Sequence, residues 1–141
     1  MGICEAANDQ VNIPCVLIVD DEPTLRRLMR RALAGLGLQI VEAADGFEAL
    51  EKFRIHDVVA VVSDVRMPSM NGLELLEHLQ GLAPEVPVIL VSGSEEVRSR
   101  AGAQAIGAFD FLRKPFNLLE LGHSVRGALG EARPAPSLSV A

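Results

Sequence analysis

The sequence has no apolar run that approaches the roughly 18 residues of a membrane-spanning helix. Its first residues also lack the basic start and the apolar stretch of a secretory signal. These absences argue against a membrane protein and against secretion, so we expect a cytoplasmic location.

Cysteine and positive charge are both scarce. The two cysteines, Cys4 and Cys15, do not require a disulfide, and the sequence favours a reduced protein. The net charge is -6, because 19 acidic residues outnumber 13 basic ones. An acidic protein of this kind disfavours direct binding to nucleic acid, so a role on DNA would need another module.

The sequence also lacks the patterns of three kinds of binding site. The three histidines, His56, His78 and His123, lack the spacing of metal ligands. The sequence also has no glycine-rich loop with Lys and Ser or Thr, which disfavours nucleotide hydrolysis. A flavodoxin-type cofactor site is disfavoured too, because the loop after the first strand-like run is acidic.

Strand-like and helix-like segments alternate from about Cys15 to Leu129. This pattern predicts an α/β fold, in which a parallel sheet carries helices on both faces. We expect one domain over residues 14–130, a flexible N-terminal segment over 1–13 and a flexible tail or linker over 131–141. The expected strands cover residues 16–19, 38–43, 58–63, 88–91 and 109–112.

The helices between these strands have recognisable ends. Proline at the first turn predicts that the first helix begins near Pro23, and it should end around Gly37. Asp45 is expected to cap the second helix. The fourth helix should run from Ser92 toward Ile106, and its alanines and glycines make it the weakest by propensity. We expect it to be the most mobile.

Three aspartates stand where strand-like runs end. Asp20 and Asp21 follow the first run, and Asp64 follows the third. Because parallel strands end at the same edge of a sheet, these carboxylates should lie close together. Two unit charges about 4 Å apart repel by roughly 4 kcal/mol at an effective dielectric of 20, so raised pKa values or a bound cation are expected. We favour the cation.

A hydroxyl and an ammonium group are expected at the same edge. Ser92 follows the fourth strand and Lys114 follows the fifth. With Mg²⁺ held by Asp21 and Asp64, and by Asp20 directly or through water, this set can bind a phosphoryl group. We therefore predict that Asp64 is the nucleophile, that Lys114 pairs with one phosphoryl oxygen and that Ser92 donates to another.

Together, these residues make the chain resemble the CheY-like receiver domains of two-component response regulators. The resemblance covers roughly residues 14–130. The ordered motifs that carry the resemblance are Asp20-Asp21, Asp64 with Met67-Pro68 and Gly72, Ser92, and Lys114-Pro115. The resemblance implies a flavodoxin-like three-layer α/β/α sandwich with a five-stranded parallel sheet of order 2-1-3-4-5. It also implies a cis Lys114-Pro115 bond and Mg²⁺ or Mn²⁺ as cofactor, with the backbone carbonyl of Arg66 as a further ligand and Asp20 acting through water.

The resemblance further implies a phosphoacceptor switch that assists its own phosphotransfer and dephosphorylation rather than an enzyme with turnover. A histidine kinase or histidine phosphotransfer protein would donate to Asp64. The receiver of the signal would be a downstream protein or an output domain, and the chain would be a monomer or a phosphorylation-dependent dimer. Phe111 stands where the family has a switch aromatic that moves inward as Ser92 turns to the phosphoryl group. Because the sequence has no tyrosine, a phenolic hydrogen bond is excluded there.

Two other functions use the same residues. A receiver-like scaffold would never be phosphorylated, and a phosphohydrolase would turn over an aspartyl phosphate, although the loops look too short for a substrate cap. Arginines on the first helix are expected to point outward, either as a docking surface for the phosphodonor or as a solvated face. They are Arg26, Arg27, Arg30 and Arg31.

Overall fold

The computed structural model describes residues 13–93, 97 and 99–132, so most of the two predicted flexible ends lies outside the described residues. A five-stranded parallel sheet has the order β2-β1-β3-β4-β5, as the resemblance implies. Within the described part of the chain, no helix has both the length and the apolar character needed to cross a membrane. The elements are β1 Pro14–Val19, α2 Pro23–Leu33, the 3-10 turn η1 Ala34–Leu36, β2 Gln39–Ala43, α3 Gly46–Ile55, β3 Asp57–Asp64, α4 Gly72–Leu82, β4 Val88–Ser92, α5 Arg100–Ala105, β5 Asp110–Arg113 and α6 Leu118–Ala132.

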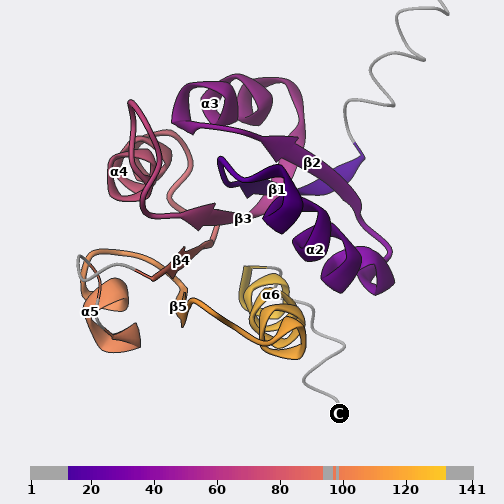
Figure 1. Cartoon of the computed structure of the whole chain (residues 1–141). Coiled ribbons are helices and arrows are strands. Elements are labelled where there is room, and N and C mark those ends of the chain that lie inside the picture. The colour runs from indigo at the N-terminus through magenta and orange to yellow at the C-terminus, as the bar shows by residue number, and fades with distance from the viewer. Residues whose placement is uncertain (1–12, 94–96, 98, 133–141) are drawn as a thin grey trace, which may run out of the picture.

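The helices form two layers on the sheet (Figure 1). One apolar core lies between the sheet and α3, α4 and α5, and the other lies between the sheet and α2 and α6. Successive residues of β1 alternate between them, with Leu17 in the first core and Ile18 in the second, both fully buried. The unbroken apolar strands of the sequence follow from this burial on both faces.

Side-chain caps fix the starts of α3 and α4. Asp45 accepts a hydrogen bond from the backbone N–H of Glu48 at 2.8 Å, as predicted. The carboxylate of Glu48 accepts from the backbone of Ala44 rather than from Asp45, so Asp45 and Glu48 do not form a reciprocal capping box. Asn71 and Glu74 form a complete one, with bonds of 2.9 and 3.0 Å. This second cap is not among those predicted from the sequence, although its spacing is the same.

The fourth predicted helix starts later than expected. Ser92 is the last residue of β4, and α5 begins only at Arg100. Ser99 caps it by accepting from the backbone of Gly102 at 3.0 Å. Several serines precede this alanine-rich segment, and each is a good N-cap, so composition alone could not locate the start. The mobility of the segment stays a prediction.

Ser69 has a left-handed backbone, with φ of 70°, in the turn between β3 and α4. A side chain in this region costs about 1–2 kcal/mol, whereas glycine adopts it freely but loses more entropy on folding. We therefore expect Ser69→Gly to raise the free energy of unfolding by about 0.5 kcal/mol. Urea denaturation would measure the change, and Ser99→Gly, at an extended N-cap position, should not stabilise.

Candidate functional site

The predicted site residues come from the ends of four strands. Asp20 follows β1, Asp64 ends β3, Ser92 ends β4 and Lys114 follows β5. Backbone bonds continue the sheet past these ends, because Asp20 N–H donates to Ala43 at 3.1 Å and Lys114 N–H donates to Ser92 at 3.0 Å. The sheet therefore fixes where each side chain emerges. The Lys114-Pro115 bond is cis, as the resemblance implies.

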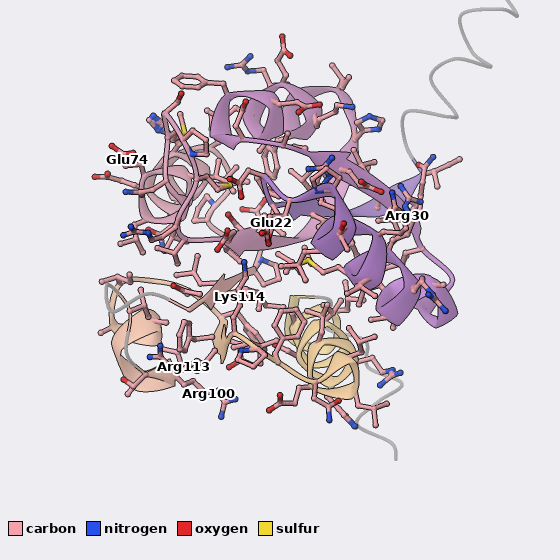
Figure 2. The ribbon with its side chains drawn as sticks, viewed as in Figure 1. Glu22, Arg30, Glu74, Arg100, Arg113 and Lys114 are labelled. Atoms are coloured by element: carbon pink, nitrogen blue, oxygen red, sulfur yellow. The ribbon has the colours of Figure 1, made fainter. Side chains whose placement is uncertain are left out.

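The three predicted carboxylates do come together. Asp20, Asp21 and Asp64 each offer an oxygen atom, and these atoms lie within 4.8 Å of one another. Asp20 is fully buried and Asp64 is 5% exposed, whereas Asp21 is exposed. The ammonium nitrogen of Lys114 lies 3.3 Å from an oxygen of Asp20 and 3.3 Å from an oxygen of Asp64. Figure 2 shows Lys114 reaching from the end of β5 toward the loop that carries Glu22.

Burial and mutual repulsion dominate the electrostatics of this cluster. Burial, together with the charge of Asp20, raises the pKa of Asp64 to about 6 even though Lys114 opposes the shift. Burial also raises the pKa of Asp20. Burial alone would lower the pKa of Lys114, but the charges of Asp20 and Asp64 raise it above its ordinary value. One ammonium group does not balance three carboxylates.

The donor set fits a small hard cation. Mg²⁺ and Mn²⁺ prefer carboxylate, carbonyl and water oxygens, and three carboxylates with surplus negative charge supply such donors. Asp21 and Arg66, together with Met67, Pro68 and Asn71, line an open hollow of about 380 Å³ beside the cluster. Arg66 therefore lies beside the carboxylate cluster. The metal-binding role of its backbone carbonyl stays a prediction.

Gly72 allows the start of α4 to pack directly on Asp64. Its N–H donates to the carbonyl of Val65 at 2.8 Å. A Cβ atom at this position would lie 2.2 Å from the carbonyl oxygen of Asp64 and 2.9 Å from the Cα of Val65. Only glycine fits such a close approach of two backbones. The sequence marked Gly72 as part of a motif, and the structure gives the steric reason.

The two predicted switch residues are both buried. Ser92 is fully buried and Phe111 is 5% exposed within the core under α4 and α5. The guanidinium of Arg113 lies 5.4 Å from the centre of the Phe111 ring and donates to the carbonyl of Val97 at 3.1 Å. The inward movement of Phe111 stays a prediction, and its ring is already inside in this structure.

The expectation that the arginines of the first helix all point outward is wrong for Arg26. Its side chain is only 17% exposed and turns back toward β1 and β2. It donates to the carbonyl oxygen of Asp20 at 2.6 Å and to Glu42 at 3.0 Å, and Arg30 donates to the other Glu42 oxygen at 2.7 Å. The available signal was Glu42 itself, an acidic residue that stands in β2 between the buried Val41 and Ala43.

Comparison with known proteins gives consistent matches. A family model described as the response regulator receiver domain matches residues 16–126. Response regulator MprA of Mycobacterium tuberculosis is 35% identical over 119 residues, which are 84% of this chain and 52% of MprA. The DNA-binding transcriptional regulator NtrC of Escherichia coli is 38% identical over 105 residues, which are 74% of this chain and 22% of NtrC. The chain thus spans about half of the first relative and less of the second.

Solved structures agree with the sequence matches. A CheY-like response regulator receiver domain protein from Methanospirillum hungatei has a TM-score of 0.77 at 27% identity, covering 86% of this chain and 97% of that one. Response regulator protein TrrA from Thermotoga maritima, solved in complex with Mg²⁺-BeF, has a TM-score of 0.73 at 32% identity. That match covers 83% of this chain and all of TrrA.

Proposed function

The chain belongs to the family of response regulator receiver domains, and from this premise we propose that Asp64 is its phosphoacceptor. The observation that carries the proposal is the position of the Asp64 carboxylate. It is nearly buried, it lies 3.3 Å from the Lys114 ammonium, and it shares its surroundings with two further aspartates. We propose residues 14–130 as the receiver unit.

In the transfer, a carboxylate oxygen of Asp64 forms a bond to phosphorus as the bond between phosphorus and the donor breaks. The donor leaves with that bond's electron pair, and the product is an aspartyl phosphate. Lys114 can turn from the Asp64 carboxylate to a phosphoryl oxygen, and Ser92 can donate to another. Mg²⁺ held by Asp21, Asp64 and the Arg66 carbonyl, and by Asp20 through water, would offset negative charge at the site. The magnesium in the TrrA structure supports this cofactor.

The phosphorylated state would alter the region from β4 to α6. Ser92 and Phe111 connect the acceptor to that region, which supports a shift in the population of partner-binding states. A histidine kinase or a histidine phosphotransfer protein in the cytoplasm is the proposed donor. The proposed target of the signal is a downstream protein or an output domain. The chain is proposed to act as a monomer or as a phosphorylation-dependent dimer.

Incubation with acetyl phosphate and Mg²⁺ tests the proposal. We expect a single alkali-labile phosphoryl group that peptide mass spectrometry locates on Asp64, and none when EDTA removes the metal. Asp57→Asn is the matched control for Asp64→Asn, because it removes an exposed carboxylate from the other end of β3.

Two results would contradict the proposal. A folded protein that takes up no phosphoryl group would be a receiver-like scaffold. Steady turnover of a phosphate ester, lost in Asp64→Asn, would indicate a phosphohydrolase, which the family membership does not favour.

A further inference from the structure

Arg26 holds the backbone that presents two of the three aspartates. Its Nη1 donates to the carbonyl oxygen of Asp20 at 2.6 Å. That carbonyl belongs to the peptide unit that joins Asp20 to Asp21, and a peptide unit is rigid and planar. The bond from Arg26 therefore sets the direction in which the chain enters Asp21.

The other end of Asp20 is fixed independently. Its N–H donates to the carbonyl of Ala43 at 3.1 Å, which extends the sheet by one bond. Its carboxylate accepts from the backbone of Glu22 at 2.9 Å and contacts Lys114. Asp21 is exposed, so its position depends on the backbone more than on packing around its side chain.

The Arg26 side chain is itself held in place. Its Nε donates to one oxygen of Glu42 at 3.0 Å, and the Nε of Arg30 donates to the other at 2.7 Å. The pKa of Glu42 lies below its usual range, chiefly because of the hydrogen bond from Arg30. Burial opposes this shift, and the hydrogen bond from Arg26 adds to it. The guanidinium group is a planar fork, so one nitrogen fixed on Glu42 directs the others.

We propose that Arg26 is a positioning residue for the divalent cation, acting through the Asp20–Asp21 peptide unit. The inference rests on the proposed function, because it assumes the metal site described there. Residues that orient metal ligands from behind typically change metal affinity when they are replaced. Arg26 would orient Asp20 and Asp21 in this way, through its bond to the backbone between them. Unlike those two residues, it carries a positive charge.

That positive charge makes the proposal easy to separate from simple electrostatics. Removing a cation from the neighbourhood of a metal site should strengthen metal binding if charge alone matters. Removing a residue that positions the ligands should weaken it. The two explanations therefore predict opposite signs for Arg26→Ala.

Calorimetric titration of the full chain with Mg²⁺, at constant ionic strength and without a phosphodonor, shows whether Arg26→Ala weakens or strengthens Mg²⁺ binding. We expect Arg26→Ala to bind Mg²⁺ about tenfold more weakly than the unchanged protein. Arg27→Ala removes the same charge from an exposed neighbour on the same helix and should bind as the unchanged protein does or slightly tighter. Arg26→Lys keeps the charge but lacks the fork, so it should also bind more weakly, by a smaller factor.

Phosphorylation provides a second measurement. The Mg²⁺ concentration that gives half the maximal rate with acetyl phosphate should rise in Arg26→Ala, while the rate at saturating Mg²⁺ should change little. A general loss of folding would instead lower the rate at saturating Mg²⁺, and circular dichroism would detect it. If Arg26→Ala fails to fold, Arg26→Lys decides the question.

The possible failures are distinct. If the unchanged protein binds Mg²⁺ and both Arg26 variants bind it as tightly, the positioning role is overturned and the proposed function stands. If the unchanged protein binds no Mg²⁺, the metal site of the proposed function falls, and the role of Arg26 falls with it.

Discussion

Asp64→Asn should abolish phosphoryl uptake and yet make the metal-free protein more stable, by about 1 to 2 kcal/mol at pH 7. The first effect follows because an amide is a poor nucleophile toward phosphorus. The second follows because the buried Asp64 carboxylate, repelled by Asp20, has a pKa of about 6 in the folded protein. At pH 7 the folded state must therefore hold a charge that it accommodates poorly. Loss of the contact with Lys114 reduces the gain.

The gain should depend on pH with a definite sign. Because burial raises the Asp64 pKa from 3.8 to about 6, the folded protein binds more protons than the unfolded chain between those values. Its stability should therefore fall as the pH rises through that window. Asparagine does not titrate, so the variant and the unchanged protein should differ little near pH 4 and most above about pH 6.

Urea denaturation in EDTA across this pH range would measure the difference, and Asp57→Asn provides the control for a charge change on the same strand. We expect the control to differ from the unchanged protein by less than about 0.5 kcal/mol. Added Mg²⁺ should stabilise the unchanged protein more than Asp64→Asn, because binding to the folded state alone raises stability. Equal stability of the two proteins in EDTA at pH 7 would show that the carboxylate cluster is not under electrostatic stress.

Gly72→Ala should destabilise the protein by about 3 kcal/mol, which is large for the addition of one methyl group. The new Cβ would lie 2.2 Å from the Asp64 carbonyl oxygen, and the next nearest atoms also belong to the backbone. Backbone atoms cannot turn aside as a flexible side chain can, so α4 or the end of β3 must move. Because that movement displaces Asp64 itself, the rate of phosphorylation should fall as well.

Gly81→Ala is the matched control, since it adds the same methyl group to the same helix. A Cβ at Gly81 meets no atom within 4 Å. Alanine also favours the helix more than glycine does, so this variant should gain about 0.5 kcal/mol. Denaturation midpoints of the two variants, with unchanged m-values, would give the comparison. A Gly72→Ala protein as stable as the unchanged one would mean that the contact with Asp64 is easily relieved.

The sheet and the grouping of the site side chains were predictable because their signals are local. Asp20 and Ser92 follow apolar runs directly, and Asp64 and Lys114 follow within two residues, so these side chains could be placed at one edge before any geometry was known. Strand order and the cis bond before Pro115 came from the resemblance rather than from residue patterns, because propensity does not determine which strands pair.

The errors concern long side chains and competing caps. Arg26 stands three residues before Met29 and seven before Leu33, the two buried residues of α2, so it lies beside the buried face, from which its long side chain reaches the carbonyl of Asp20. The start of α5 depended on which of several serines makes the capping bond, and Ser99 makes it. In both cases a contact between a side chain and the backbone decided the outcome, and residue patterns alone do not say which of the possible contacts forms.

The contact between Lys114 and Asp20 joins residues that are 94 positions apart. During synthesis the ribosome therefore releases all three aspartates well before the lysine that pairs with them. A nascent chain that ends after β4 has the Asp64 carboxylate without its ammonium partner, and loop closure of this length is slow compared with local helix formation. The carboxylate cluster thus gains its ammonium partner only once the last strand has joined the sheet.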